Sequence, residues 1–96
     1  MAFDIEIRDE AAIEVADAYI YYEMRLKGLG ERFLEQLEIQ FERIKKYPEH
    51  FQIKREPYWE TGVAKFPFVI VYQLFESKII VFSVFNTHCN PLKKPI

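Results

Sequence analysis

The first half of the chain begins with a two-residue hydrophobic period and then changes to a helical one. Apolar and charged side chains alternate from Phe3 to Arg8, which predicts a strand with one buried face. A first helix is predicted from Asp9 to about Lys27, and a second continues until Pro48 stops it. Their expected apolar faces are Ala12, Val15, Ala16, Tyr19, Tyr22 and Leu26 in the first helix, and Phe33, Leu34, Leu37, Phe41 and Ile44 in the second.

After Pro48 the hydrophobic period returns to two, which is typical of strands. A strand over residues 51–54 is expected to be short or to lie at a sheet edge, because Pro57 and the turn-prone segment 60–62 interrupt the pattern. Strand structure is expected to resume at residues 63–66.

The most apolar part of the chain predicts a hairpin at the centre of a sheet. The first five residues of the segment 68–75 form a nearly continuous apolar run, as in a strand that is covered on both faces. The short polar segment 76–78 joins them to a second apolar run at residues 79–85, which we expect to pair with the first.

Together these patterns predict a single α+β domain over residues 1–96. An N-terminal strand leads into an antiparallel two-helix hairpin, which Gly28 and Gly30 allow to reverse tightly, and a mainly antiparallel sheet of about four strands follows. The helices can cover only one face of this sheet. The other face also carries apolar residues, and C-terminal residues, a dimer or a dedicated partner chain are the alternatives for covering it.

Composition excludes several classes of protein. Half of the 96 residues are hydrophobic, which suffices for a core, and the single cysteine cannot form an intramolecular disulfide. No spacing among His50, His88 and Cys89 resembles a zinc site, so we expect neither a metal nor a cofactor. The acidic N-terminus is unlike a signal peptide and the longest apolar run is too short to span a bilayer, so we expect a cytoplasmic protein.

Charge is distributed unevenly along the chain. The net charge of −2 argues against a general nucleic-acid binder, whose surface must offset many phosphates. Residues 1–49 hold twelve acidic and seven basic side chains, a balance of −5, whereas residues 50–96 hold three acidic and six basic ones, a balance of +3. An anionic partner should therefore prefer the C-terminal half.

The order and spacing of four segments are similar to those of a known family. These segments are the opening strand, the helix pair that ends at residues 44–48, the apolar strand at 66–72 and the polar stretch at 84–91. In this order they resemble the RelE/ParE toxins of bacterial type II toxin–antitoxin modules, which include plasmid-stabilisation systems. The resemblance implies a small sheet with two N-terminal helices. It also implies a cognate antitoxin that wraps around the toxin and prevents it from arresting growth.

The same resemblance leaves two mechanisms open. RelE-like members cleave mRNA in the ribosomal A site, whereas ParE-like members bind DNA gyrase and poison it without a known hydrolytic site of their own. RNA cleavage without a metal needs a base, an acid and cations that stabilise the charged transition state.

The chain supplies few of these groups. All five arginines precede the strand pair, so Arg55 alone is expected near the site, with Lys54, Lys65 and His88 as companions. Asn86 stands where the resemblance implies a histidine, and Cys89 stands near the point where it implies an arginine. We therefore expect no complete ribonuclease site. If the protein is nevertheless a ribonuclease, Arg55 and Lys65 would bind phosphate and His88 would transfer protons.

Three functions follow as hypotheses. The first is a ParE-like toxin that binds an essential target such as DNA gyrase, the second is a ribosome-dependent mRNA endonuclease, and the third is an inactive member that serves only as a binding module. An antitoxin is the expected partner, and a homodimer or a toxin–antitoxin hetero-oligomer is the expected assembly. The side chains expected to meet the antitoxin or the target are Tyr21, Lys54, Arg55, Trp59, Lys65, His88, Lys93 and Lys94.

Overall fold

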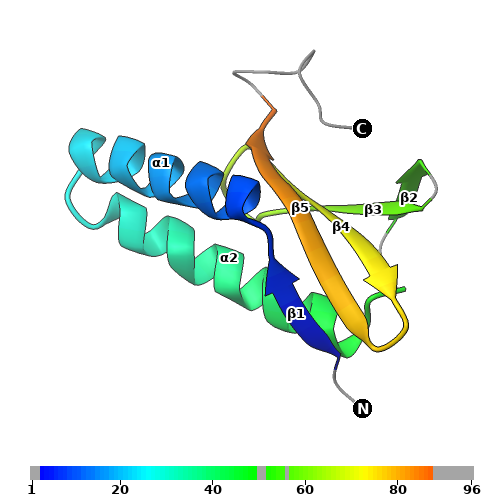
Figure 1. Ribbon diagram of the computed structural model, residues 1–96. Helices are drawn as coiled ribbons and strands as arrows, with labels where there is room; N and C mark the ends of the chain where they lie inside the picture. Colours follow the sequence, from blue (N-terminus) through cyan, green and yellow to red (C-terminus); the bar gives the residue numbers. More distant parts are fainter. Residues whose placement is uncertain (1–2, 50–51, 56, 88–96) are drawn as a thin grey trace.

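One strand, two helices and four further strands follow one another along the chain (Figure 1). The computed structural model describes residues 3–49, 52–55 and 57–87, and describes only the backbone at 52–55. The elements are β1 (Asp4–Ile7), α1 (Asp9–Arg25), α2 (Leu29–Lys46), β2 (Gln52–Arg55), β3 (Tyr58–Gly62), β4 (Phe68–Phe75) and β5 (Lys78–Asn86). This order confirms the expected α+β fold.

The five strands form one sheet in the order β1-β5-β4-β3-β2. β1 lies parallel to β5, and the other neighbouring pairs are antiparallel. β4 lies at the centre, where Ile70, Val71 and Tyr72 are fully buried, as the continuous apolar run predicts. β2 lies at the edge, as expected for a short strand before Pro57. The two helices run antiparallel to each other alongside the sheet (Figure 1).

β3 lies where the sequence pattern predicted an interruption. The expectation that residues 60–62 break the sheet and that strand structure resumes at 63–66 is wrong, because β3 ends at Gly62 and 63–66 belong to the connection to β4. β3 pairs with β4 along its length, with Trp59 opposite Tyr72. Pairing with the central strand therefore outweighs the local turn preference of this segment.

The link between the helices depends on two glycines and one carboxylate. Gly28 has a φ of 90° and immediately precedes α2, in a conformation that favours glycine. The carboxylate of Glu23 accepts hydrogen bonds from the backbone N–H groups of Gly28, at 3.1 Å, and Gly30, at 2.8 Å. A Cβ atom at Gly30 would lie 2.7 Å from the carbonyl oxygen of Tyr19, so the helices approach closely here only because the side chain is absent.

The buried face of α1 overlaps the expected one but is shifted around the helix. Tyr22 is buried and Val15 packs against the core, as expected. Ala11 and Ala18 are buried as well, whereas Ala12 of the expected face is exposed. Apolar residues occur around most of the circumference of α1, so the helical period alone allows more than one buried face. The positions of α2 and β5 determine which face is covered.

The core between helices and sheet is rich in aromatic rings. Tyr22, Phe33, Phe66 and Phe68 form a cluster in which neighbouring ring centroids lie 4.9–6.1 Å apart. α2 contributes Phe33, Leu37 and Ile44 as buried residues, and these belong to the apolar stripe that the sequence predicts.

A bulge in β5 changes which side chains face the helices. Val71 lies opposite Ser83 and Tyr72 lies opposite Val81, so β5 contains one additional residue, Phe82, at this point. As a result Val81 and Val84 both join the core beneath the helices, although simple alternation would place them on opposite faces.

Candidate partner-binding surfaces

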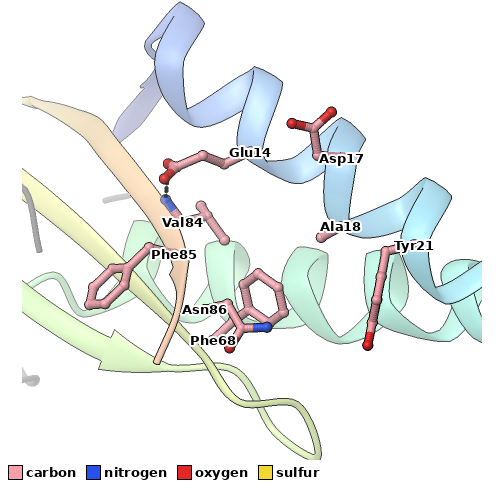
Figure 2. A pocket seen from close by; sticks show the side chains of 8 residues that line it. All are labelled: Glu14, Asp17, Ala18, Tyr21, Phe68, Val84, Phe85 and Asn86. Atoms are coloured by element: carbon pink, nitrogen blue, oxygen red, sulfur yellow. Dashed lines mark hydrogen bonds between the residues drawn. The ribbon is translucent and has the colours of Figure 1, made fainter. Parts of the chain in front are cut away.

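A notch of about 360 Å³ opens between α1 and the end of β5 (Figure 2). α1 contributes Glu14, Asp17, Ala18 and Tyr21, and the sheet contributes Phe68, Val84, Phe85 and Asn86. Figure 2 shows the Glu14 side chain pointing at the backbone of Val84. The Asp17 side chain points away from the sheet, and the Tyr21 side chain lies beside the opening of the notch.

The notch exists because β5 is longer than its parallel neighbour. Pairing with β1 ends at Ile7 and Val81, and the N–H of Arg8 donates the last hydrogen bond, at 3.0 Å, to the carbonyl of Val81. β5 then continues to Asn86, and none of the strands in the described part of the chain pairs with this edge beyond Val81.

Glu14 partly replaces the missing strand. One of its carboxylate oxygens accepts a hydrogen bond from the N–H of Val84 and another from the hydroxyl of Ser83, both at 2.9 Å. A buried or half-buried backbone N–H needs such a partner, so this side chain fixes the distance between α1 and β5.

The chemistry of the notch suits a cationic and apolar segment better than a phosphate. Ala18, Phe68 and Val84 supply apolar surface, and two carboxylates, those of Glu14 and Asp17, lie on the α1 side. These negative charges would repel a nucleic-acid backbone and attract a lysine or arginine.

The second candidate surface is the far face, by which we mean the sheet face turned away from the helices. Its exposed centre is formed by Tyr58 and Phe82, whose ring centroids lie 5.4 Å apart. The guanidinium of Arg8 lies over the ring of Phe82, 5.1 Å from its centroid. Val71 and Phe85 are buried and lie outside the core cluster beneath the helices, whereas Phe82 remains half-exposed.

The predicted surface residues that the structure describes with their side chains lie in three different places. Tyr21 borders the notch, where its hydroxyl accepts a hydrogen bond of 3.0 Å from the guanidinium of Arg25. Trp59 is half-buried and stacks on Tyr72, with ring centroids 6.3 Å apart, on the helix side of the sheet. Lys65 is exposed in the connection between β3 and β4, with a φ of 71°.

The other predicted residues lie partly or wholly outside the described residues. Lys54 and Arg55 belong to β2, and the backbone of Arg55 pairs with that of Tyr58, but their side chains are not described. His88, Lys93 and Lys94 lie outside the described residues, as do His50 and Cys89.

Sequence reasoning did not place Arg8 beside Phe82. The parallel pairing of β1 with β5 brings the Arg8 guanidinium over this ring. The alternation at residues 3–8 predicted a strand, but its neighbour in the sheet could not be read from the pattern. Glu14 was missed for a related reason, since its partner on β5 lies seventy positions away in the chain.

Neither a metal site nor a membrane-spanning helix is found in the part of the chain that the structure describes. No group of three or more His, Cys, Asp or Glu side chains could hold a metal ion there. In the same residues, neither helix combines the length and the hydropathy needed to cross a membrane.

Comparison with known proteins identifies the family. Residues 5–89 match the family model described as the ParE toxin of the type II toxin–antitoxin system parDE. No curated protein matches the chain. A chromosomal ParDE toxin–antitoxin system from P. aeruginosa is similar in structure, with a TM-score of 0.65 and 12% identity over 88% of this chain and 96% of that one.

A mutant of the E. coli toxin RelE in the free state is also similar, with a TM-score of 0.71 and 18% identity over 97% of this chain and 92% of that one. At these identities the two structures show a shared fold. The family assignment comes from the match over residues 5–89, which covers most of the chain. The chain therefore belongs to the ParE toxin family of type II toxin–antitoxin systems.

Proposed function

We propose that this protein arrests growth by binding an essential cellular target, with DNA gyrase as the candidate, and not by cleaving RNA. The observation that carries this proposal is the scarcity of cationic side chains on β3, β4 and β5. No arginine follows Arg55 in the sequence. In β3, β4, β5 and the turns that join them, the only cations are Lys65 and Lys78, and Lys78 is paired with Glu6 at 3.3 Å.

Such a surface is poorly suited to RNA cleavage. A phosphorane-like transition state gathers negative charge, which several fixed cations must balance when no metal is bound. Arg8 is the cation that the structure adds to the far face, and it stacks on a ring and lies 3.6 Å from Glu10. A protein surface that binds another protein has no such requirement.

We further propose that a cognate antitoxin in the cytoplasm neutralises the toxin by covering the notch and the exposed centre of the far face. The far face offers Phe82 and Tyr58 as partly exposed rings. The notch offers apolar surface next to two carboxylates. An antitoxin segment that combines apolar and basic side chains would satisfy both surfaces.

A RelE-like endonuclease remains the second candidate, supported by the position of Arg8 on the far face and by the cations of the C-terminal half. In that case Arg55 and Lys65 would bind phosphate and His88 would transfer protons. An inactive family member that only binds a partner is the third candidate.

A triple substitution separates these candidates. Arg55→Ala, Lys65→Ala and His88→Ala are combined in one chain, and growth is followed after induction without antitoxin. The matched control removes three exposed cations of α2 by Arg32→Ala, Arg43→Ala and Lys46→Ala. The proposal expects growth arrest from the native chain and from both variants.

Two outcomes would contradict the proposal. Loss of arrest in the first triple variant alone, with antitoxin binding retained, would favour the endonuclease. No arrest by the native chain would favour an inactive binding module. Primer extension on translated mRNA gives an independent measurement, because an endonuclease acting in the ribosomal A site produces codon-phased cuts and a gyrase poison does not.

A further inference from the structure

The chain leaves the sheet at the rim of the notch. Asn86, the last residue of β5, lines the notch together with Asp17 of α1. Thr87 is held next to it, because its backbone N–H donates a hydrogen bond of 2.9 Å to the carbonyl of Pro67 and its hydroxyl donates another of 3.2 Å to the same oxygen. The C-terminal segment, by which we mean residues 88–96, therefore starts from a fixed point beside the notch.

Asp17 gives the notch an exposed negative charge. Among the described residues it makes no hydrogen bond or ion pair, whereas the carboxylate of Glu14 accepts hydrogen bonds from β5. The neighbours of a helical residue lie three and four positions away, and none of those of Asp17 is basic. Beside this carboxylate the notch is apolar, with Ala18, Phe68 and Val84 in its lining.

The C-terminal segment has a composition that is complementary to the notch. Leu92 and Ile96 are apolar, Lys93 and Lys94 are basic, and the segment contains no acidic residue. A proline stands on either side of residues 92–94, and prolines at this spacing disfavour a helix. The segment is therefore suited to lie across the notch in an extended conformation.

The segment is also long enough to cross the notch. On α1 the notch extends from Glu14 to Tyr21, a distance of roughly 10 Å at the rise of an α-helix. An extended chain from Thr87 to Lys93 spans at most roughly 20 Å. Leu92 and the two lysines can therefore reach the α1 side of the notch even if the chain turns back after β5.

We propose that in the free toxin the C-terminal segment folds back over the notch, with Leu92 on its apolar surface and Lys93 and Lys94 beside Asp17. An exposed ion pair contributes little to stability, so burial of Leu92 supplies most of the attraction and the charges fix the position of the segment. This inference does not depend on the cellular target. The antitoxin segment proposed above for the notch has the same chemistry and would compete with the C-terminal segment.

A spin label at the end of the chain reports the position of the segment. Cys89 is the only cysteine, so Cys89→Ser combined with Ile96→Cys allows a single nitroxide to be attached at position 96 of the full chain. The amide NMR signals of Ala18 and Tyr21 should then lose most of their intensity, because the unpaired electron broadens the signals of nearby nuclei. The amide signal of Glu42, on the outer side of α2, is the reference and should keep its intensity.

A charge reversal tests the contact with Asp17. Asp17→Lys in the labelled chain should strongly reduce the broadening at α1, and the further substitutions Lys93→Glu and Lys94→Glu should restore it. Glu38→Lys makes the same change of charge on the outer side of α2 and should leave the broadening unchanged. Leu92→Ser should also reduce the broadening, because it removes the apolar contact.

Three results would overturn the proposal, provided that circular dichroism shows each variant to be folded. The first is equal broadening at Ala18 and at Glu42, and the second is no effect of Asp17→Lys. The third is broadening that appears when spin-labelled chain is mixed with isotope-labelled chain that carries no spin label, because the segment would then lie on a second copy. None of these results bears on growth arrest, so this inference and the proposed function can fail separately.

Discussion

At the scale of single residues, Glu14 shows how one side chain can take over hydrogen bonds that a neighbouring strand would otherwise make. Its carboxylate accepts hydrogen bonds from the N–H of Val84 and the hydroxyl of Ser83 where β1 no longer pairs with β5. The helical pattern of α1 allowed several buried faces, so it did not single out this residue. Its role depends on a partner seventy positions away in the chain, which no local pattern can reveal.

Removing this carboxylate should destabilise the fold. Glu14→Ala leaves the N–H of Val84 without its acceptor, and we expect the free energy of unfolding to fall by about 1–3 kcal/mol. Asp17→Ala is the matched control, because Asp17 is exposed on the same helix, and its effect should stay within about 0.5 kcal/mol. Urea unfolding monitored by fluorescence measures both. Equal effects of the two substitutions would show that the hydrogen bonds of Glu14 contribute nothing to stability.

The buried hydroxyl of Tyr72 offers a second test at this scale. It donates a hydrogen bond of 2.6 Å to the carbonyl of Pro48, and burial raises the pKa of this tyrosine. Tyr72→Phe should lower the free energy of unfolding by about 1 kcal/mol, because the buried carbonyl loses its donor. Tyr47→Phe, at an exposed position, should have no measurable effect in the same unfolding experiment. A Tyr72→Phe protein as stable as the native chain would contradict this role.

At the scale of elements, the sequence predicted which segments are helices and strands better than how they pack. The period of 3.6 and Pro48 defined α2 and its buried stripe, because one face of that helix is clearly apolar. The face predicted for α1 is only partly right, since its apolar residues are spread around the helix and Tyr22, but not Ala12, is buried. β3 and the bulge at Phe82 were not predicted, because both depend on pairing with neighbouring strands.

The link between α1 and α2 makes stability depend on pH. The backbone N–H of Gly28 is the largest cause that lowers the pKa of Glu23, and the N–H of Gly30 adds to it. The folded state therefore holds the proton less tightly than the unfolded state. The stabilisation by the Glu23 carboxylate is complete above the unfolded pKa of about 4.3, and is lost as pH falls through the lower folded pKa.

Glu23→Gln isolates this contribution. Thermal unfolding should show a smaller loss of Tm for the variant than for the native chain when the pH is lowered from about 7 to about 3. Glu35→Gln, at an exposed position of α2, controls for the general effect of removing one acid. An equal fall in Tm for the native chain and for Glu23→Gln would show that this carboxylate does not make the stability of the helix link depend on pH.

The same link should be sensitive to a single methyl group. In Gly30→Ala the new Cβ atom would lie 2.7 Å from the backbone oxygen of Tyr19, so the helices would have to separate. We expect a loss of about 1–3 kcal/mol in the free energy of unfolding. Gly62→Ala is the control, because its nearest neighbour, the Phe68 oxygen, would lie at 3.9 Å. Similar losses in both variants would contradict a close contact at Gly30.

At the scale of the whole molecule, the resemblance to RelE/ParE toxins predicted the fold and the family, and the match over residues 5–89 confirms the family. The site was harder to predict. Tyr21 does border a notch, but Trp59 packs toward the core, and Arg8 reaches the far face through a parallel pairing that the sequence does not reveal. Residues from different elements form each candidate surface, so their assembly requires the tertiary structure.

The central claim is that this protein acts by binding a target, with gyrase as the candidate, and carries no ribonuclease site. A supercoiling assay with purified gyrase and increasing amounts of the purified chain tests it most directly. We expect supercoiling to be lost as the chain is added, and to be lost equally with the variant that combines Arg55→Ala, Lys65→Ala and His88→Ala. Full supercoiling at every concentration of a chain that still arrests growth would contradict the claim.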